Sequence, residues 1–266
     1  MPDSGLLDPL PALWPWVALL VGLVVGSFAN VCIHRLPERL SVVRPRSRCP
    51  RCAAPIGAAD NIPVLSYLVL GGRCRACRAP ISARYPVVEA VNAAMYFALA
   101  RLMGPTPQAV VAMALVTALL VLTLIDYDHQ ILPDAVTLPG IAAGLAASLL
   151  AGPPTPLSSV AAAGGGYLAF WAVAKAYERT RGIEGLGQGD WKMTAMLGAF
   201  LGWEKLLLTV FVATVAGTVV GLGLMAFKGR SGRHALPLGT FLGIAGIAVV
   251  FAGQPVLDWY RGLLHG

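Results

Sequence analysis

The chain has 266 residues, of which 57% are hydrophobic and 12% are charged. Ordinary soluble domains carry about 25% charged residues, so this composition excludes a typical soluble protein and indicates a membrane protein. The net charge is +7, and ten of the twenty Lys and Arg residues lie between residues 35 and 84. A basic loop between membrane helices accounts for this charge, so nucleic acid is not an expected partner.

Eight apolar segments approach the ~20 residues that a helix needs to cross a bilayer, which predicts an all-α polytopic membrane protein. Proline and glycine separate several of them, because proline cannot continue a helix interior. The segment 190–203 is short for a full crossing. The expected spans are residues 13–33, 87–103, 108–125, 135–151, 157–176, 190–203, 206–227 and 236–252.

The distribution of positive charge predicts the orientation of these spans. We expect a first membrane helix in residues 1–34, a cytoplasmic insertion at 35–85, a membrane domain at 86–252 and an interfacial tail at 253–266. The first helix is expected to be retained, because no Lys or Arg precedes Trp14 as a signal peptide would require. With the insertion inside, alternation also places the basic loops 177–189 and 228–235 inside. Asp126 ends an inward-running span and Asp190 begins an outward-running one, so both acids are expected at the cytoplasmic face.

Four cysteines in the insertion form two C-x2-C pairs, Cys49 with Cys52 and Cys74 with Cys77, separated by 21 residues. This spacing is close to that of zinc sites in which two pairs complete a tetrahedron of thiolates. Two disulfides or four free thiols are the alternatives, and a reducing cytoplasm disfavours the disulfides. Four cysteine ligands leave no open coordination position, so the zinc would be structural. Cys32, in the first span, is interpreted as a small apolar residue.

Asp126 and Asp190 are the candidate catalytic residues, because charged groups at membrane depth are costly and usually functional. Two adjacent carboxylates cannot both ionise cheaply, so one could keep a proton while the other activates a water. The alternative is that these acids only cap helix ends. Asp128 and Asp134 are competing candidates, and Asp134 could be the N-cap of the fourth span.

Several other residues are candidates for support of this site. Lys192 could tune Asp190, bind a substrate carboxylate or simply reach the interface. Gly187 and Gly189 are expected to keep the loop before Asp190 mobile, since glycine lacks the steric limits of other residues. Glu89, an acid early in the second span, needs a partner or a function.

Several motifs are spread along the chain: Gly26-Ser27-Phe28-Ala29-Asn30-Val31, His34-Arg35-Leu36-Pro37, Ser47-Arg48-Cys49-Pro50, Asp60-Asn61-Ile62-Pro63-Val64-Leu65-Ser66-Tyr67, Arg84-Tyr85-Pro86-Val87-Val88-Glu89, Ile125-Asp126, Leu132-Pro133-Asp134 and Gly187-Gln188-Gly189-Asp190. These motifs resemble those of the type IV prepilin peptidases, membrane aspartic proteases of bacterial pilus and type II secretion systems. The resemblance covers nearly the whole chain. One departure is Ala53, which follows the second cysteine where many relatives have glycine. Another is Leu236-Pro237-Leu238-Gly239-Thr240-Phe241, which differs from the commoner version with phenylalanine-glycine-proline.

The resemblance implies that Asp126 and Asp190 are catalytic, rather than Asp128 and Asp134. It implies cleavage of the basic leader of prepilins or pseudopilins on the cytoplasmic side of the bacterial inner membrane. Relatives with the four-cysteine insertion also methylate the new N-terminus with S-adenosylmethionine. No G-x-G-x-x-G motif follows a predicted strand, so the methyl-donor site stays unassigned, with Glu89 as a weak candidate. A peptidase without methyltransferase activity and a non-catalytic zinc-ribbon scaffold or transporter are the alternatives.

Overall fold

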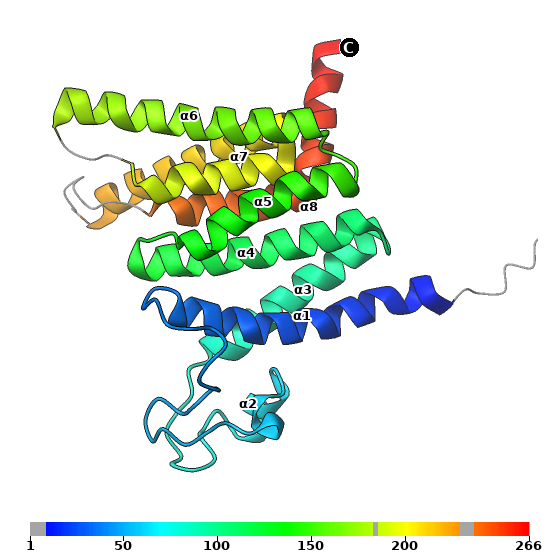
Figure 1. Ribbon diagram of the computed structural model, residues 1–266, viewed down its shortest axis with the longest axis vertical. Coiled ribbons are helices and arrows are strands. Elements are labelled where there is room, and N and C mark those ends of the chain that lie inside the picture. The colour runs from blue at the N-terminus through cyan, green and yellow to red at the C-terminus, as the bar shows by residue number, and fades with distance from the viewer. Residues whose placement is uncertain (1–8, 183–185, 229–236, 266) are drawn as a thin grey trace, which may run out of the picture. The chain divides into compact units, whose positions relative to one another are not determined.

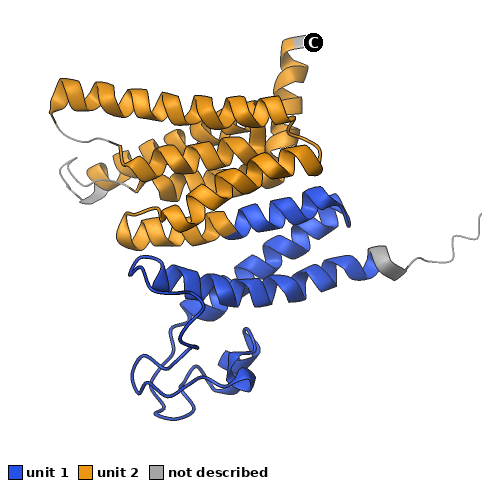
Figure 2. Cartoon of the chain, viewed as in Figure 1, with its two compact units in different colours: residues 1–117 blue, residues 118–266 orange. Residues whose placement is uncertain are grey.

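The computed structural model describes residues 9–182, 186–228 and 237–265, and in these ranges the regular structure is helical (Figure 1). The all-α prediction is therefore confirmed. The chain forms two compact units, residues 1–117 and residues 118–266 (Figure 2). The helices are α1 (Pro9–Arg35), α2 (Leu65–Val69), α3 (Arg84–Met103), α4 (Pro107–His129), α5 (Asp134–Leu150), α6 (Pro156–Arg181), α7 (Gln188–Lys228) and α8 (Leu238–His265), with a short 3-10 helix at Ala58–Asn61.

Five of these helices, α1, α4, α6, α7 and α8, are long and apolar enough to cross a membrane. The chain is thus a multi-pass membrane protein. Two predicted spans are not among the five: α5 has only 17 residues, and the 20-residue α3 contains Arg84, Glu89 and Arg101.

In the first unit, α1 and α3 pack closely because glycines remove side chains from their interface. A Cβ at Gly22 would lie 2.8 Å from Ala93 Cα, and one at Gly26 would lie 2.8 Å from Glu89 Cα. This spacing of small residues lets helix backbones approach in membranes. The fully buried Asn92 adds polar contacts, because its amide nitrogen donates to Gly22 O at 2.8 Å and its oxygen accepts from Thr117 Oγ1 at 2.8 Å.

In the second unit, α7 contacts α5, α6 and α8 and reverses direction at Gly202. Gly202 has φ 72°, a left-handed conformation that favours glycine. Thr194, before the reversal, and Leu206, after it, both lie 3.0 Å from a Cβ at Gly166, so the two halves of α7 lie beside the same stretch of α6. The two halves correspond to the predicted spans 190–203 and 206–227.

One predicted segment boundary is wrong. The predicted polar loop begins too early at residue 177, because α6 continues to Arg181 and ends at Gly182, whose φ of 69° is typical of a helix C-cap. Arg179 and Arg181 in the last turn also suit the negative end of the helix dipole. The predicted tail after residue 253 is helical, since α8 runs through it with Pro255 inside, and the red end of α8 points away from the rest of the helix in Figure 1. That this tail lies at the membrane interface stays a prediction. Residues 229–235 of the predicted loop 228–235, and the first residue of the predicted span 236–252, lie outside the described residues. Pro237 is described and precedes α8.

Candidate functional site

Asp126 lies in the last turn of α4 and is buried, with 5% of its surface exposed. The C-terminal end of a helix disfavours a negative charge, so a carboxylate there needs donors from elsewhere. Thr240, at the start of α8, supplies two of them: its backbone N–H donates to Asp126 Oδ2 at 2.6 Å and its hydroxyl donates to the same oxygen at 3.0 Å. The Thr240 hydroxyl also lies 3.4 Å from Thr123 O, so α8 is attached to the last two turns of α4 at this point.

Asp190 lies in the first turn of α7 and is half-buried. Its backbone N–H donates to Gly187 O at 3.1 Å, and its backbone carbonyl accepts from Thr194 Oγ1 at 2.8 Å. This N-terminal position suits an acid, since unpaired backbone N–H groups point along the helix axis. This position agrees with the prediction that Asp190 lies at the start of a helix.

The fold brings Asp126 and Asp190 close enough for their charges to interact. Leu132, in the link between α4 and α5, lies between the segments that hold them. A Cβ at Gly239 would lie 2.9 Å from both Asp126 Cγ and Leu132 Cδ1, and a Cβ at Gly189 would lie 2.8 Å from Leu132 Cβ. The neighbouring side chains lie so close that only glycine fits at both positions. Neither glycine has a positive φ.

Lys192 and Asp134, two of the predicted supporting residues, interact with each other. Lys192 Nζ donates to both carboxylate oxygens of Asp134, at 2.7 and 2.8 Å, which joins α7 to the first turn of α5. The sequence suggested that Asp134 could be the N-cap of this helix. That suggestion is wrong, because Pro133 occupies the N-cap position of α5. Asp128 is exposed, whereas Asp126, two residues earlier, is buried beside Thr240.

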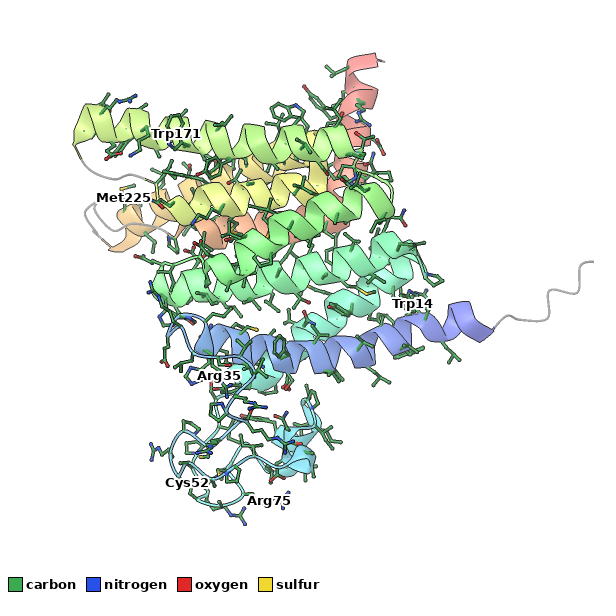
Figure 3. All side chains as sticks on the ribbon, in the orientation of Figure 1. Trp14, Arg35, Cys52, Arg75, Trp171 and Met225 are labelled. Atoms are coloured by element: carbon green, nitrogen blue, oxygen red, sulfur yellow. The ribbon has the colours of Figure 1, made fainter. Side chains whose placement is uncertain are left out.

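The four cysteines of the insertion form one cluster whose sulfur atoms all lie within 4.8 Å of one another (Cys52 is labelled in Figure 3). The Sγ atoms of Cys49 and Cys77 are 3.8 Å apart, far beyond the ~2.05 Å of a disulfide. A tetrahedron with Zn–S bonds of ~2.3 Å has sulfur atoms ~3.8 Å apart, so the cluster fits a metal ion with four thiolate ligands. Backbone N–H groups of Cys52 and Arg51 donate to the Cys49 thiol and lower its pKa to about 6, which favours the thiolate that a metal binds.

The two cysteine pairs belong to an internal repeat, which the prediction of a zinc site from the cysteine spacing did not include. Residues 48–56 and 73–81 share the pattern R-C-x-x-C-x-A-P-I. In both copies the first cysteine donates its N–H to the alanine carbonyl of the repeat at 2.9 Å, and its own carbonyl accepts from the residue that follows the second cysteine. That residue is Ala53 in one copy and Arg78 in the other, and their φ angles are 56° and 58°. The departure at Ala53 therefore falls on a position where glycine would be less strained.

Polar contacts stabilise the middle of the insertion and join it to α3. Arg75 pairs with Asp60, with Nη2 and Oδ1 2.6 Å apart, and this pairing lowers the pKa of the Asp60 carboxyl. Glu89 is buried in α3 and accepts from the Val64 N–H at 2.7 Å, next to the start of α2. Val64 has φ 61°, a strained conformation for a β-branched residue. Glu89 thus has a structural partner, and this contact gives no support to its weak candidacy for the methyl-donor site.

Comparison with known proteins gives the same family for most of the chain. The family model described as bacterial peptidase A24 N-terminal domain matches residues 20–103, and the one described as type IV leader peptidase family matches residues 113–222. A prepilin leader peptidase/N-methyltransferase of Aeromonas hydrophila is 38% identical over 94% of this chain and 95% of its own length. Proteins of the same description from Burkholderia pseudomallei (strain 1026b) and Pseudomonas aeruginosa are 41% identical, over 90% of this chain and 85% of the relative, and 35% identical, over 98% of each. No solved structure matches the chain.

Proposed function

The chain belongs to the type IV leader peptidase family, and we propose that it is a prepilin leader peptidase and N-methyltransferase. The observation that carries the peptidase assignment is the pairing of Asp126 and Asp190 from the ends of two helices, with Thr240 holding the more buried acid. The substrates are prepilins or pseudopilins, which carry a basic leader before an apolar helix.

In the proposed reaction, one carboxylate of the dyad is ionised and the other is protonated. The ionised carboxylate takes a proton from a water molecule as the water oxygen attacks the carbonyl carbon of the scissile peptide. The protonated carboxyl gives its proton to the carbonyl oxygen, which forms a neutral diol. The other carboxyl, which now holds the proton from the water, then protonates the peptide nitrogen as the C–N bond breaks, and the remaining carboxylate takes a proton from a diol hydroxyl. Both Thr240 donors engage Asp126 Oδ2, which orients the carboxyl group so that Oδ1 can face the water.

We place the site at the cytoplasmic face of the bacterial inner membrane. The support is the basic insertion between α1 and α3, because positive loops stay on the cytoplasmic side. We propose eight crossings in total, with α3, α5 and each half of α7 counted as separate spans. The protein works within the lipid bilayer.

We assign structural zinc to the cluster of Cys49, Cys52, Cys74 and Cys77, because four thiolate ligands fill a tetrahedral coordination shell. The metal would fix the two repeats of the insertion to each other. S-adenosylmethionine, the proposed methyl donor, would supply an electrophilic methyl group to the new N-terminal amine. The C–N bond would form as the C–S bond breaks, S-adenosylhomocysteine would leave, and the amine would lose a proton.

Mass spectrometry of a purified prepilin, incubated with the purified protein and S-adenosylmethionine, tests both activities together. We expect loss of the leader mass and a gain of one methyl group. Asp126→Asn and Asp190→Asn should each abolish cleavage in a folded, membrane-inserted protein, while Asp128→Asn and Asp134→Asn should be milder. Leader loss without methyl gain would limit the function to the peptidase, and near wild-type cleavage by either single dyad variant would exclude the dyad.

A further inference from the structure

An apolar groove with a volume of about 630 Å³ lies in the second unit, between α6, the second half of α7 and the start of α8. Small residues of α7, Ala213, Gly217 and Gly221, form one side of it, and Phe241 of α8 forms another. Among the residues that the structure describes, no Asp, Glu, Lys or Arg lines the groove. The groove therefore suits an apolar occupant.

Two threonines, Thr214 and Thr218, line the groove but leave it suited to an apolar ligand. Thr214 and Thr218 donate their hydroxyls to the carbonyls of Val210 and Thr214 in the same helix, each at 2.8 Å. Their hydrogen-bonding capacity is thus used inside α7, so an apolar ligand could cover them without leaving a donor unpaired.

Both segments that present the dyad also contribute residues to the groove. Leu186, which lines the groove, precedes Asp190 by four residues. Leu238 and Phe241, which also line it, flank Gly239 and Thr240, the residues that contact Asp126. The groove is therefore lined in part by residues within four positions of the dyad acids or their contacts.

The groove is also long enough for several helical turns. Its residues on α7 extend from Ala213 to Met225, and 12 residues of α-helix rise roughly 18 Å. Met225, labelled in Figure 3, marks the end of the groove where α7 nears its last residue, Lys228. Leu186 lines the same groove, so this part of α7 lies beside the loop that leads to Asp190.

We propose that this groove binds the apolar helix that follows the cleavage point of the prepilin, and so aligns the scissile bond with the dyad. The inference rests on the proposed peptidase function. When the scissile bond lies between Asp126 and Asp190, the apolar residues after it must leave the site through apolar surroundings. The groove provides those surroundings on the two segments that adjoin the acids.

Filling the groove tests this inference. Gly217→Leu places a side chain into it, since a Cβ at Gly217 would already lie 3.5 Å from Phe241 Cδ2. Gly223→Leu is the matched control on the same helix, because a Cβ there meets nothing within 4 Å and Gly223 does not line the groove. Each variant is assayed with a full-length prepilin and with a peptide that ends before the apolar helix.

We expect Gly217→Leu to lower kcat/KM for the full prepilin roughly tenfold or more, because a misfit of a few methylenes in an apolar pocket costs that much. Cleavage of the short peptide, and both activities of Gly223→Leu, should stay near wild type. Equal loss for both substrates, or no loss for either, would overturn the groove assignment. A wild-type protein that cleaves neither substrate would instead contradict the peptidase function.

A photo-crosslinking amino acid identifies the occupant directly. It replaces Met225 or, as the control, Gly223, in the Asp190→Asn background so that the prepilin stays intact. We expect an adduct with the apolar segment of the prepilin from position 225 and little from position 223. Adducts with phospholipid alone at position 225 would show that a lipid acyl chain occupies the groove and would overturn the proposal.

Discussion

Replacing Thr240 by valine removes one of the two donors to Asp126 while keeping the shape of the side chain. The lost bond joins the Thr240 hydroxyl to Asp126 Oδ2 at 3.0 Å, and the backbone N–H at 2.6 Å remains. A hydrogen bond to a charged group contributes about 1.5–3 kcal/mol, and its loss in a buried site is not compensated by water. If the bond serves the transition state, kcat/KM should fall roughly 10- to 150-fold, since 1.36 kcal/mol corresponds to tenfold in rate.

The assay is cleavage of a prepilin at several substrate concentrations, together with the thermal midpoint in detergent. Thr240→Ser restores the hydroxyl and should recover most of the activity. Thr209→Val is the matched control, because the buried Thr209 hydroxyl donates only to Lys205 O in its own helix at 2.8 Å. Wild-type turnover of Thr240→Val, or failure of serine to rescue it, would refute the view that this hydroxyl positions Asp126.

Four further predictions concern single positions. Gly189→Ala should reduce cleavage strongly, because its new Cβ would lie only 2.8 Å from Leu132 Cβ. Gly187→Ala should reduce cleavage only mildly, because its Cβ would lie 3.6 Å from Asp190 Oδ2. Equal turnover of the two variants would argue against steric control. Ala53→Gly should stabilise the insertion by about 0.5–1 kcal/mol, because glycine adopts the positive φ at this position without steric strain. The stability is measured as resistance of the insertion to unfolding by a zinc chelator. Unchanged resistance would count against strain at Ala53. Cys74→Ser should lower the zinc content from about one ion per chain to nearly none, measured by metal analysis of the purified protein. Glu89→Ala should make the segment around α2 more sensitive to proteolysis without abolishing cleavage, since it removes the acceptor of the Val64 N–H; wild-type proteolysis would contradict this role.

Much of the fold could be predicted from the sequence because apolar length and helix breakers are local signals. The break between α3 and α4 falls where Gly104-Pro105-Thr106-Pro107 predicts it, and α3 ends at Met103. The reversal in α7 was expected near residue 204 and occurs at Gly202. The end of α6 was missed, because a helix can extend beyond its apolar stretch when charged residues suit its last turn.

The site was predictable where it depends on local motifs and not where it depends on contacts between distant segments. The positions of Asp126 and Asp190 at helix ends follow from the pattern of spans. The contact of Thr240 with Asp126 joins residues 114 positions apart, and no local signal reports such a pair. The ion pair of Lys192 with Asp134, 58 positions apart, was missed for the same reason.

The cysteine insertion has almost no hydrophobic core. Between residues 36 and 83, all of which the structure describes, only Cys49 and Ser66 are buried. A segment of this size that buries so little must obtain its folding free energy from another source, and four thiolates around zinc provide one. By linkage, each tenfold fall in free zinc then removes about 1.4 kcal/mol from the stability of the insertion. The second unit keeps its own buried residues, such as Leu119, Leu197 and Leu242, so zinc starvation would unravel the insertion while the helices around the dyad stay folded.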